Sequence, residues 1–213
     1  MRKYLEIGGV VATVVLIVFG VVAIALGVNG RNTVRDSLKA EQIVGSPDMT
    51  KAGIAAEAKA AGLPASLKLP TANIAGKAIT TGALARDFAE YMRIHALEAS
   101  GGLTYSQMPR YASADGKGTN DATKATKGAN GQPLDNAARD TWVTETALST
   151  ALNASFLAEN VALFGIVTGV AFLLTGIGFG ILVLFGSLRG REPGLLFGKR
   201  KPEVAGTKTV PAA

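Results

Sequence analysis

The stretch VALFGIVTGVAFLLTGIGFGILVLF, residues 161–185, decides the fold of this chain. Among its 25 positions, 16 are Ile, Val, Leu or Phe, and none carries a charge. A helix of that length reaches roughly 37 Å, which exceeds the roughly 30 Å hydrocarbon core of a bilayer. Because helices in soluble cores are usually shorter or more amphipathic, the stretch predicts a transmembrane helix.

A second apolar stretch, IGGVVATVVLIVFGVVAIALGV, occupies residues 7–28. Of its 22 residues, 14 are Ile, Val, Leu or Phe, and again none is charged. Arg2 and Lys3 before it and Ala23-Ile24-Ala25 within it also fit a cleaved signal peptide, so cleavage stays open. The length of the stretch favours an uncleaved anchor. The predicted fold class is therefore an all-α membrane protein with two transmembrane helices.

The distribution of basic residues predicts the topology. Two basic residues lie in the lead (residues 1–6) and six in the tail (residues 186–213), which we expect to be disordered. The connecting loop, residues 29–160, holds 14 basic and 13 acidic residues and is nearly neutral. Since basic residues that flank short segments stay in the cytoplasm, we expect a cell-membrane protein with both termini cytoplasmic and the loop extracytoplasmic.

The loop is predicted to form a mostly helical domain. We expect the first helix to break at Asn29-Gly30, and residues 112–132, which lack large apolar side chains, to form a mobile loop. Residues 140–160 contain no Gly or Pro, so a stalk helix should continue directly into the second span. Capping residues and Gly or Pro stops predict further helices over residues 34–44, 51–61 and 81–99.

Small residues recur on one face of each apolar stretch. In the first, taken together with Leu16, they alternate at spacings of four and three, and in the second they form two GxxxG steps. Such faces let helix backbones approach closely in lipid, so they predict a helix-packing seam. Whether the faces pair within one chain or between copies stays open. The seam residues are Gly9, Thr13, Gly20, Ala23 and Gly27, and then Gly165, Gly169, Gly176 and Gly180.

Residues that carry most enzymatic chemistry are scarce. The chain has no cysteine, which excludes disulfides, thiolate nucleophiles and cysteine-based metal sites. The single histidine, His95, lies on the apolar face of helix 81–99 without a carboxylate four residues away on that face. We expect His95 to be structural, and we predict no catalytic, cofactor-binding or metal-binding residue.

A possible binding face combines His95 with aromatic side chains. Phe88 and Tyr91 share the apolar face of the same predicted helix, and Trp142 lies in the stalk. The basic residues are not clustered with aromatic ones, so nucleic-acid binding is not expected.

The layout resembles a group of uncharacterised two-span membrane proteins of high-GC actinobacteria. The similarity rests on KAEQIVGSPD at residues 39–48, HALEASGGLTY at residues 95–105 and NASFLAENVAL at residues 153–163. Some of these proteins bear an automatic label as aromatic ring-opening dioxygenases. A non-haem iron site uses about two histidines and a carboxylate, so the one histidine of this chain does not support that label.

These observations favour a non-catalytic membrane protein. We expect a structural or accessory subunit that contacts the lipid bilayer and forms homo- or hetero-oligomers with other membrane proteins. A ligand-binding or sensory module is the first alternative, and an enzyme whose site the sequence does not reveal is the second. No cofactor is expected.

Overall fold

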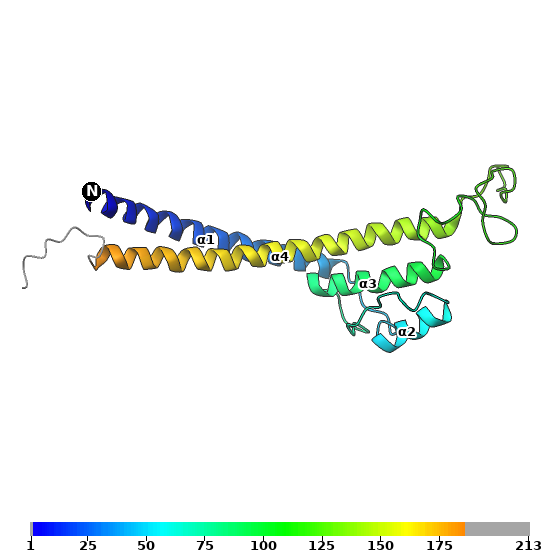
Figure 1. The fold of residues 1–213 in the computed structure, drawn as a ribbon, viewed down its shortest axis with the longest axis horizontal. Coiled ribbons are helices and arrows are strands. Elements are labelled where there is room, and N and C mark those ends of the chain that lie inside the picture. Colours follow the sequence, from blue (N-terminus) through cyan, green and yellow to red (C-terminus); the bar gives the residue numbers. More distant parts are fainter. Residues whose placement is uncertain (1, 186–213) are drawn as a thin grey trace, which may run out of the picture. The chain divides into compact units, whose positions relative to one another are not determined.

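A computed structural model describes residues 2–185, and the predicted cytoplasmic tail lies outside the described residues. Within that range the chain forms α-helices and no strand, as the predicted fold class requires. The two longest helices are each long and apolar enough to cross a membrane. The helices are α1 (Arg2–Ala40), α2 (Lys51–Ala60), α3 (Gly82–Ala99) and α4 (Ala137–Leu184) (Figure 1).

The chain divides into two compact units. One is Val21–Val170, which we call the helical unit, and the other comprises the described parts of Met1–Gly20 and Ala171–Ala213, which we call the terminal unit. Helices α1 and α4 contribute residues to both.

In the terminal unit, α1 and α4 pack in antiparallel directions through small residues. A Cβ added to Gly176 would lie 3.0 Å from the Ile17 backbone nitrogen, and one added to Gly180 would lie 3.2 Å from the Thr13 methyl group. The Thr13 hydroxyl donates to the Gly9 carbonyl at 2.8 Å, so this polar group is satisfied within its own helix.

In the helical unit, α3 lies antiparallel to the first part of α4. Gly82 at the start of α3 lies against Phe156, and Arg93 near its end lies over the Trp142 ring at 4.7 Å. Helix α2 packs on α3 (Figure 1). The main core is formed by Leu38, Met49, Ile54, Ala58, Ile74, Ile79, Ala85, Ala89, Tyr91, Ile94 and Leu152.

The helices predicted over residues 51–61 and 81–99 appear as α2 and α3, each differing from the predicted range by one residue at one end. Thr50 caps α2 by accepting from the Gly53 amide at 3.0 Å, and Thr81 caps α3 by accepting from the Leu84 amide at 3.3 Å. Helix α3 stops before Gly101 and Gly102, both of which have positive φ. Helix α4 is unbroken from Ala137 to Leu184, which confirms the continuous stalk and apolar segment.

The predicted break at Asn29-Gly30 is wrong, because α1 continues to Ala40. The helix predicted over residues 34–44 is therefore part of α1 as far as Ala40, and Thr33 within it donates its hydroxyl to the Asn29 carbonyl four residues back at 3.0 Å. Packing against α4 compensates for the low helix propensity of Gly30. The two helices are close there, since a Cβ at Gly30 would lie 3.6 Å from the Ala162 side chain. A glycine inside a helix costs about 1 kcal/mol, which tertiary contacts can outweigh.

Residues 112–132 form turns, and bridges near both ends of this segment bring its ends together. Tyr111 forms bridges with Thr119 and Asp135, and Lys127 forms one with Pro133. Ala125 is buried. The mobility expected for this segment stays a prediction.

Candidate functional site

A half-buried carboxylate joins three helices of the helical unit. Glu159 on α4 accepts from Arg31 and Arg35 of α1 through one oxygen, at 3.0 and 2.7 Å. Its other oxygen accepts from the Gly82 amide, the first residue of α3, at 2.6 Å. The Glu159 side chain is 12% exposed. We call these four residues the Glu159 junction.

The electrostatics of the junction favour an ionised carboxylate. Burial by itself would raise the pKa of Glu159, but the hydrogen bonds from Gly82, Arg31 and Arg35 outweigh it and hold the pKa below its usual value. The start of α3 adds the positive end of a helix dipole. A single charge therefore fixes α1 and α3 onto α4.

The junction lies directly beyond the point where both long helices change from apolar to polar sequence. The apolar stretches end at residue 28 in α1 and begin at residue 161 in α4. A Cβ on Gly27 would lie 2.6 Å from the Ala162 carbonyl oxygen, so the two ends lie side by side. The two boundaries between apolar and polar sequence are 133 positions apart along the chain, yet they lie next to each other in the structure.

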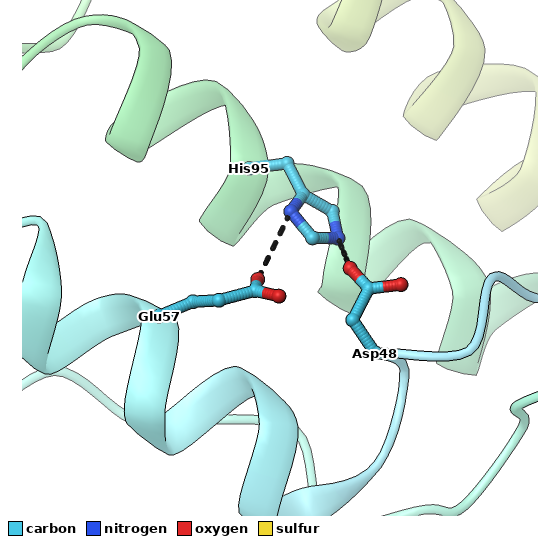
Figure 2. A group of neighbouring side chains, drawn as sticks. All are labelled: Asp48, Glu57 and His95. Carbon is cyan, nitrogen blue, oxygen red and sulfur yellow. Dashed lines mark ion pairs between the residues drawn. The ribbon is translucent and has the colours of Figure 1, made fainter.

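A second cluster surrounds the single histidine. The imidazole of His95 on α3 lies between two carboxylates: its Nε2 is 3.4 Å from Asp48, and its Nδ1 is 3.5 Å from Glu57 on α2 (Figure 2). Glu98, one turn further along α3, is 3.9 Å from Nδ1. We call these four residues the His95 cluster. All four side chains are partly exposed.

The two main carboxylates of the His95 cluster differ in their environments. The hydrogen bond from Ser46 lowers the pKa of Asp48. Burial, followed by repulsion from Asp48, raises the pKa of Glu57. The Oε2 atom of Glu57 is buried and accepts no hydrogen bond. The group can therefore hold a cation or exchange a proton.

The helical unit also has an apolar groove of about 610 Å³. Its walls are ridges of three helices: Leu38 on α1, Phe88 and Met92 on α3, and Leu148, Leu152 and Ser155 on α4. Ile43, in the segment after α1, closes one side. Leu148 is 47% exposed there. Side chains at such helical spacings form ridges and grooves into which the side chains of another helix can pack.

The structure separates the residues of the predicted binding face. Tyr91 is fully buried, and its hydroxyl donates to the Ala72 carbonyl at 2.6 Å. Trp142 is buried in a smaller cluster with Ala96 and Met108. Phe88 lines the groove and His95 belongs to the His95 cluster. These four side chains do not share one surface.

The predicted seam residues lie at buried or half-buried positions. Gly9, Gly20 and Gly169 are buried, and a Cβ on Gly165 would lie 3.7 Å from the Ala23 carbonyl. Gly27 and Gly176 lie against both backbone and isoleucine side-chain atoms of the opposite helix, and Gly180 lies against Thr13.

Sequence reasoning missed both charged sites. The sequence indicated no further metal-ligating residue near His95. The fold brings Asp48, from the segment before α2, and Glu57, from α2, close to its imidazole. Sequence reasoning did not single out Glu159 at all. One signal was available for Glu159, since an acidic residue directly before an apolar span needs a partner or water.

Comparisons with known proteins leave the chain without a family assignment. No family model matches it, and no curated protein or solved structure matches it either. Its function must therefore be argued from the Glu159 junction, the His95 cluster and the groove.

Proposed function

We propose that this chain is a non-catalytic two-span membrane protein whose helical unit docks a helix of another membrane protein just outside the bilayer. The observation that carries the proposal is that the apolar stretches of α1 and α4 end side by side at Gly27 and Ala162, with the apolar groove on the polar side of this boundary. The Glu159 junction would hold α1 and α3, which line the groove, against α4.

Exposure of the apolar helices supports membrane insertion. A core helix of a soluble protein would be mostly buried, but only 11% of the most apolar window of α1 and 17% of that of α4 is buried. Large side chains such as Phe19, Phe164 and Leu174 are more than 60% exposed. Surfaces of this kind are stable in lipid and favour aggregation in water.

The position of the groove supports a membrane-protein partner. Ser155 lies six residues from the start of the apolar segment of α4, so the groove begins roughly 9 Å from that boundary. Glu41 is the single charged residue in its lining. A partner helix that leaves the membrane beside α4 would reach the groove and bury Leu148, Phe88 and Met92.

The topology can be tested with single cysteines, because the chain has none of its own. Ala114→Cys, at an exposed position, is expected to react with a membrane-impermeant maleimide in intact cells. Ser187→Cys, after the second apolar stretch, is expected to react only after lysis. The reverse pattern would contradict an extracytoplasmic helical unit.

Docking can be tested by photo-crosslinking in native membranes. A photoreactive residue replacing Leu148 is expected to give one adduct with a distinct membrane protein, recovered near one-to-one with this chain in mild detergent. A photoreactive residue replacing Thr150, exposed on another face of α4, is the matched control and should give none. Equal adducts at both positions, or none at Leu148, would contradict the docking groove. An adduct with a second copy of this chain would contradict a distinct partner and would indicate that the groove is an interface of a homo-oligomer.

The volume of the groove favours one further candidate function, binding of an apolar small molecule. Pockets for such ligands usually measure roughly 300–1,000 Å³, and the groove falls within that range. The same crosslinked samples distinguish the two functions, because a lipid or metabolite adduct at position 148 would be small and would leave no protein partner.

A further inference from the structure

The His95 cluster brings together groups from three segments, of which the first two are nine positions apart and the third follows 38 positions later. Asp48 precedes α2, Glu57 lies on α2, and His95 lies on α3, with all three side chains directed toward one another (Figure 2). One ligand-type atom from each lies within 4.8 Å of the others. Core packing of Ile54 and Ala58 against Ile94 holds α2 beside α3, so this convergence is built into the fold.

The charges in the cluster do not balance. Three carboxylates, those of Asp48, Glu57 and Glu98, surround one imidazole. Among the described residues, no lysine or arginine forms an ion pair with any of the three. Even a protonated imidazole would leave a net negative charge, which a divalent cation would neutralise.

A second observation points to a ligand. Glu57 Oε2 is buried and forms no hydrogen bond, and its contact within the cluster is the 3.5 Å ion pair with His95 Nδ1. Buried carboxylate oxygens ordinarily accept a hydrogen bond, and one that does not needs an explanation such as an ion. The raised pKa of Glu57, caused by burial and then by the charge of Asp48, agrees with an uncompensated negative site.

We propose that Asp48, Glu57 and His95 bind a divalent metal ion of the Zn²⁺ class. One imidazole nitrogen and two carboxylate oxygens form a donor set that suits zinc better than calcium or magnesium, which prefer oxygen alone. Zinc ligands at about 2.0–2.2 Å from the ion lie roughly 3.4 Å from one another. The present spread of up to 4.8 Å therefore needs only a small inward movement of these half-exposed side chains.

Both nitrogens of the His95 imidazole can take part in the site, one by binding the ion and the other by donating a hydrogen bond. Only one nitrogen can coordinate the ion, and a metal-bound histidine usually donates its other N–H to a carboxylate. Coordination through Nδ1 would use Glu57 and leave Asp48 to accept from Nε2, with Glu98 available as a further ligand. Coordination through Nε2 would exchange the roles of Asp48 and Glu57. The ion would tie α2 and the preceding segment to α3.

The site is tested on the full-length protein in detergent, purified without a polyhistidine tag. Calorimetric titration with zinc chloride is expected to give one ion per chain, and cobalt(II) should give the visible absorption of a nitrogen- and oxygen-ligated ion. Saturating zinc should raise the thermal midpoint of unfolding by roughly 5–10 °C at 100 times the dissociation constant.

Variants make the assignment specific. His95→Asn and Glu57→Gln are each expected to weaken zinc binding at least about 100-fold, since loss of even an outer-shell partner costs 10–100-fold. Asp36→Asn removes an exposed carboxylate on α1 and should leave binding unchanged. Circular dichroism of each variant without zinc checks that it folds. Absence of binding by the wild-type protein, or binding that His95→Asn leaves intact, would overturn the site. Either result leaves the docking proposal standing, because the groove shares no residue with the cluster.

Discussion

Replacement of Glu159 by glutamine is expected to lower the free energy of unfolding by about 3 kcal/mol. The carboxylate accepts from Arg31 and Arg35 through one oxygen and from the Gly82 amide through the other. A glutamine side chain keeps the shape but has one acceptor oxygen, so it cannot satisfy both sides. Its NH₂ group would face either the two guanidinium groups or the first amide of α3. The thermal midpoint in detergent should fall by roughly 6–12 °C.

The pH dependence gives a second readout for the same residue. The pKa of Glu159 is lowered in the folded protein, so its stabilising effect is present above the usual carboxyl pKa of 4.5 and is lost as the pH falls below it. The wild-type protein should therefore lose the advantage over Glu159→Gln as the pH falls below about 4.5. A constant stability difference across this range would contradict the junction.

A matched control separates the junction from ordinary surface charge. Asp36 pairs with Lys39 at 3.0 Å on α1, but both side chains are more than half exposed. Exposed pairs contribute roughly 0–1 kcal/mol, so Asp36→Asn should change the free energy of unfolding by less than about 0.5 kcal/mol. The contrast tests burial, because both substitutions remove one carboxylate charge.

The helices could be predicted because their signals are local. Helices α2 and α3, capped by Thr50 and Thr81, lie within one residue of the predicted ranges, and the run without Gly or Pro from residue 140 gives the continuous α4. The error at Asn29-Gly30 has a tertiary origin. Local propensity favoured a break there, but Arg31 and Arg35 reach Glu159, and these contacts keep the helix intact.

The charged sites could not be predicted because each depends on contacts between separate segments of the chain. Arg31 and Glu159 are 128 positions apart, and nothing in the spacing of either residue indicates the other. The His95 cluster joins residues 48, 57 and 95 in the same way. Sequence periodicity shows which residues share a helix face, whereas the pairing of faces depends on the packing of the whole unit.

Replacement of Gly27 by alanine is expected to destabilise the helical unit by about 2 kcal/mol, although alanine is the better helix former. The added Cβ would lie 2.6 Å from the Ala162 carbonyl oxygen and 3.0 Å from the Ile166 backbone nitrogen. Backbone atoms inside a continuous helix cannot turn aside as a side chain can. Relief would therefore require α1 and α4 to separate, with loss of contacts on both sides of the clash. Unfolding of the purified protein in mixed micelles measures the effect.

Gly30→Ala is the matched control, three residues further along the same helix. Its Cβ would meet only the Ala162 side chain, at an ordinary 3.6 Å, so no movement is required. Without a clash, the better helix propensity of alanine should stabilise the protein by roughly 0.5–1 kcal/mol. The two substitutions are chemically identical, so opposite signs can arise only from the approach of α4. If both variants were stabilised, α1 and α4 could not pack as closely at Gly27 as the structure has them.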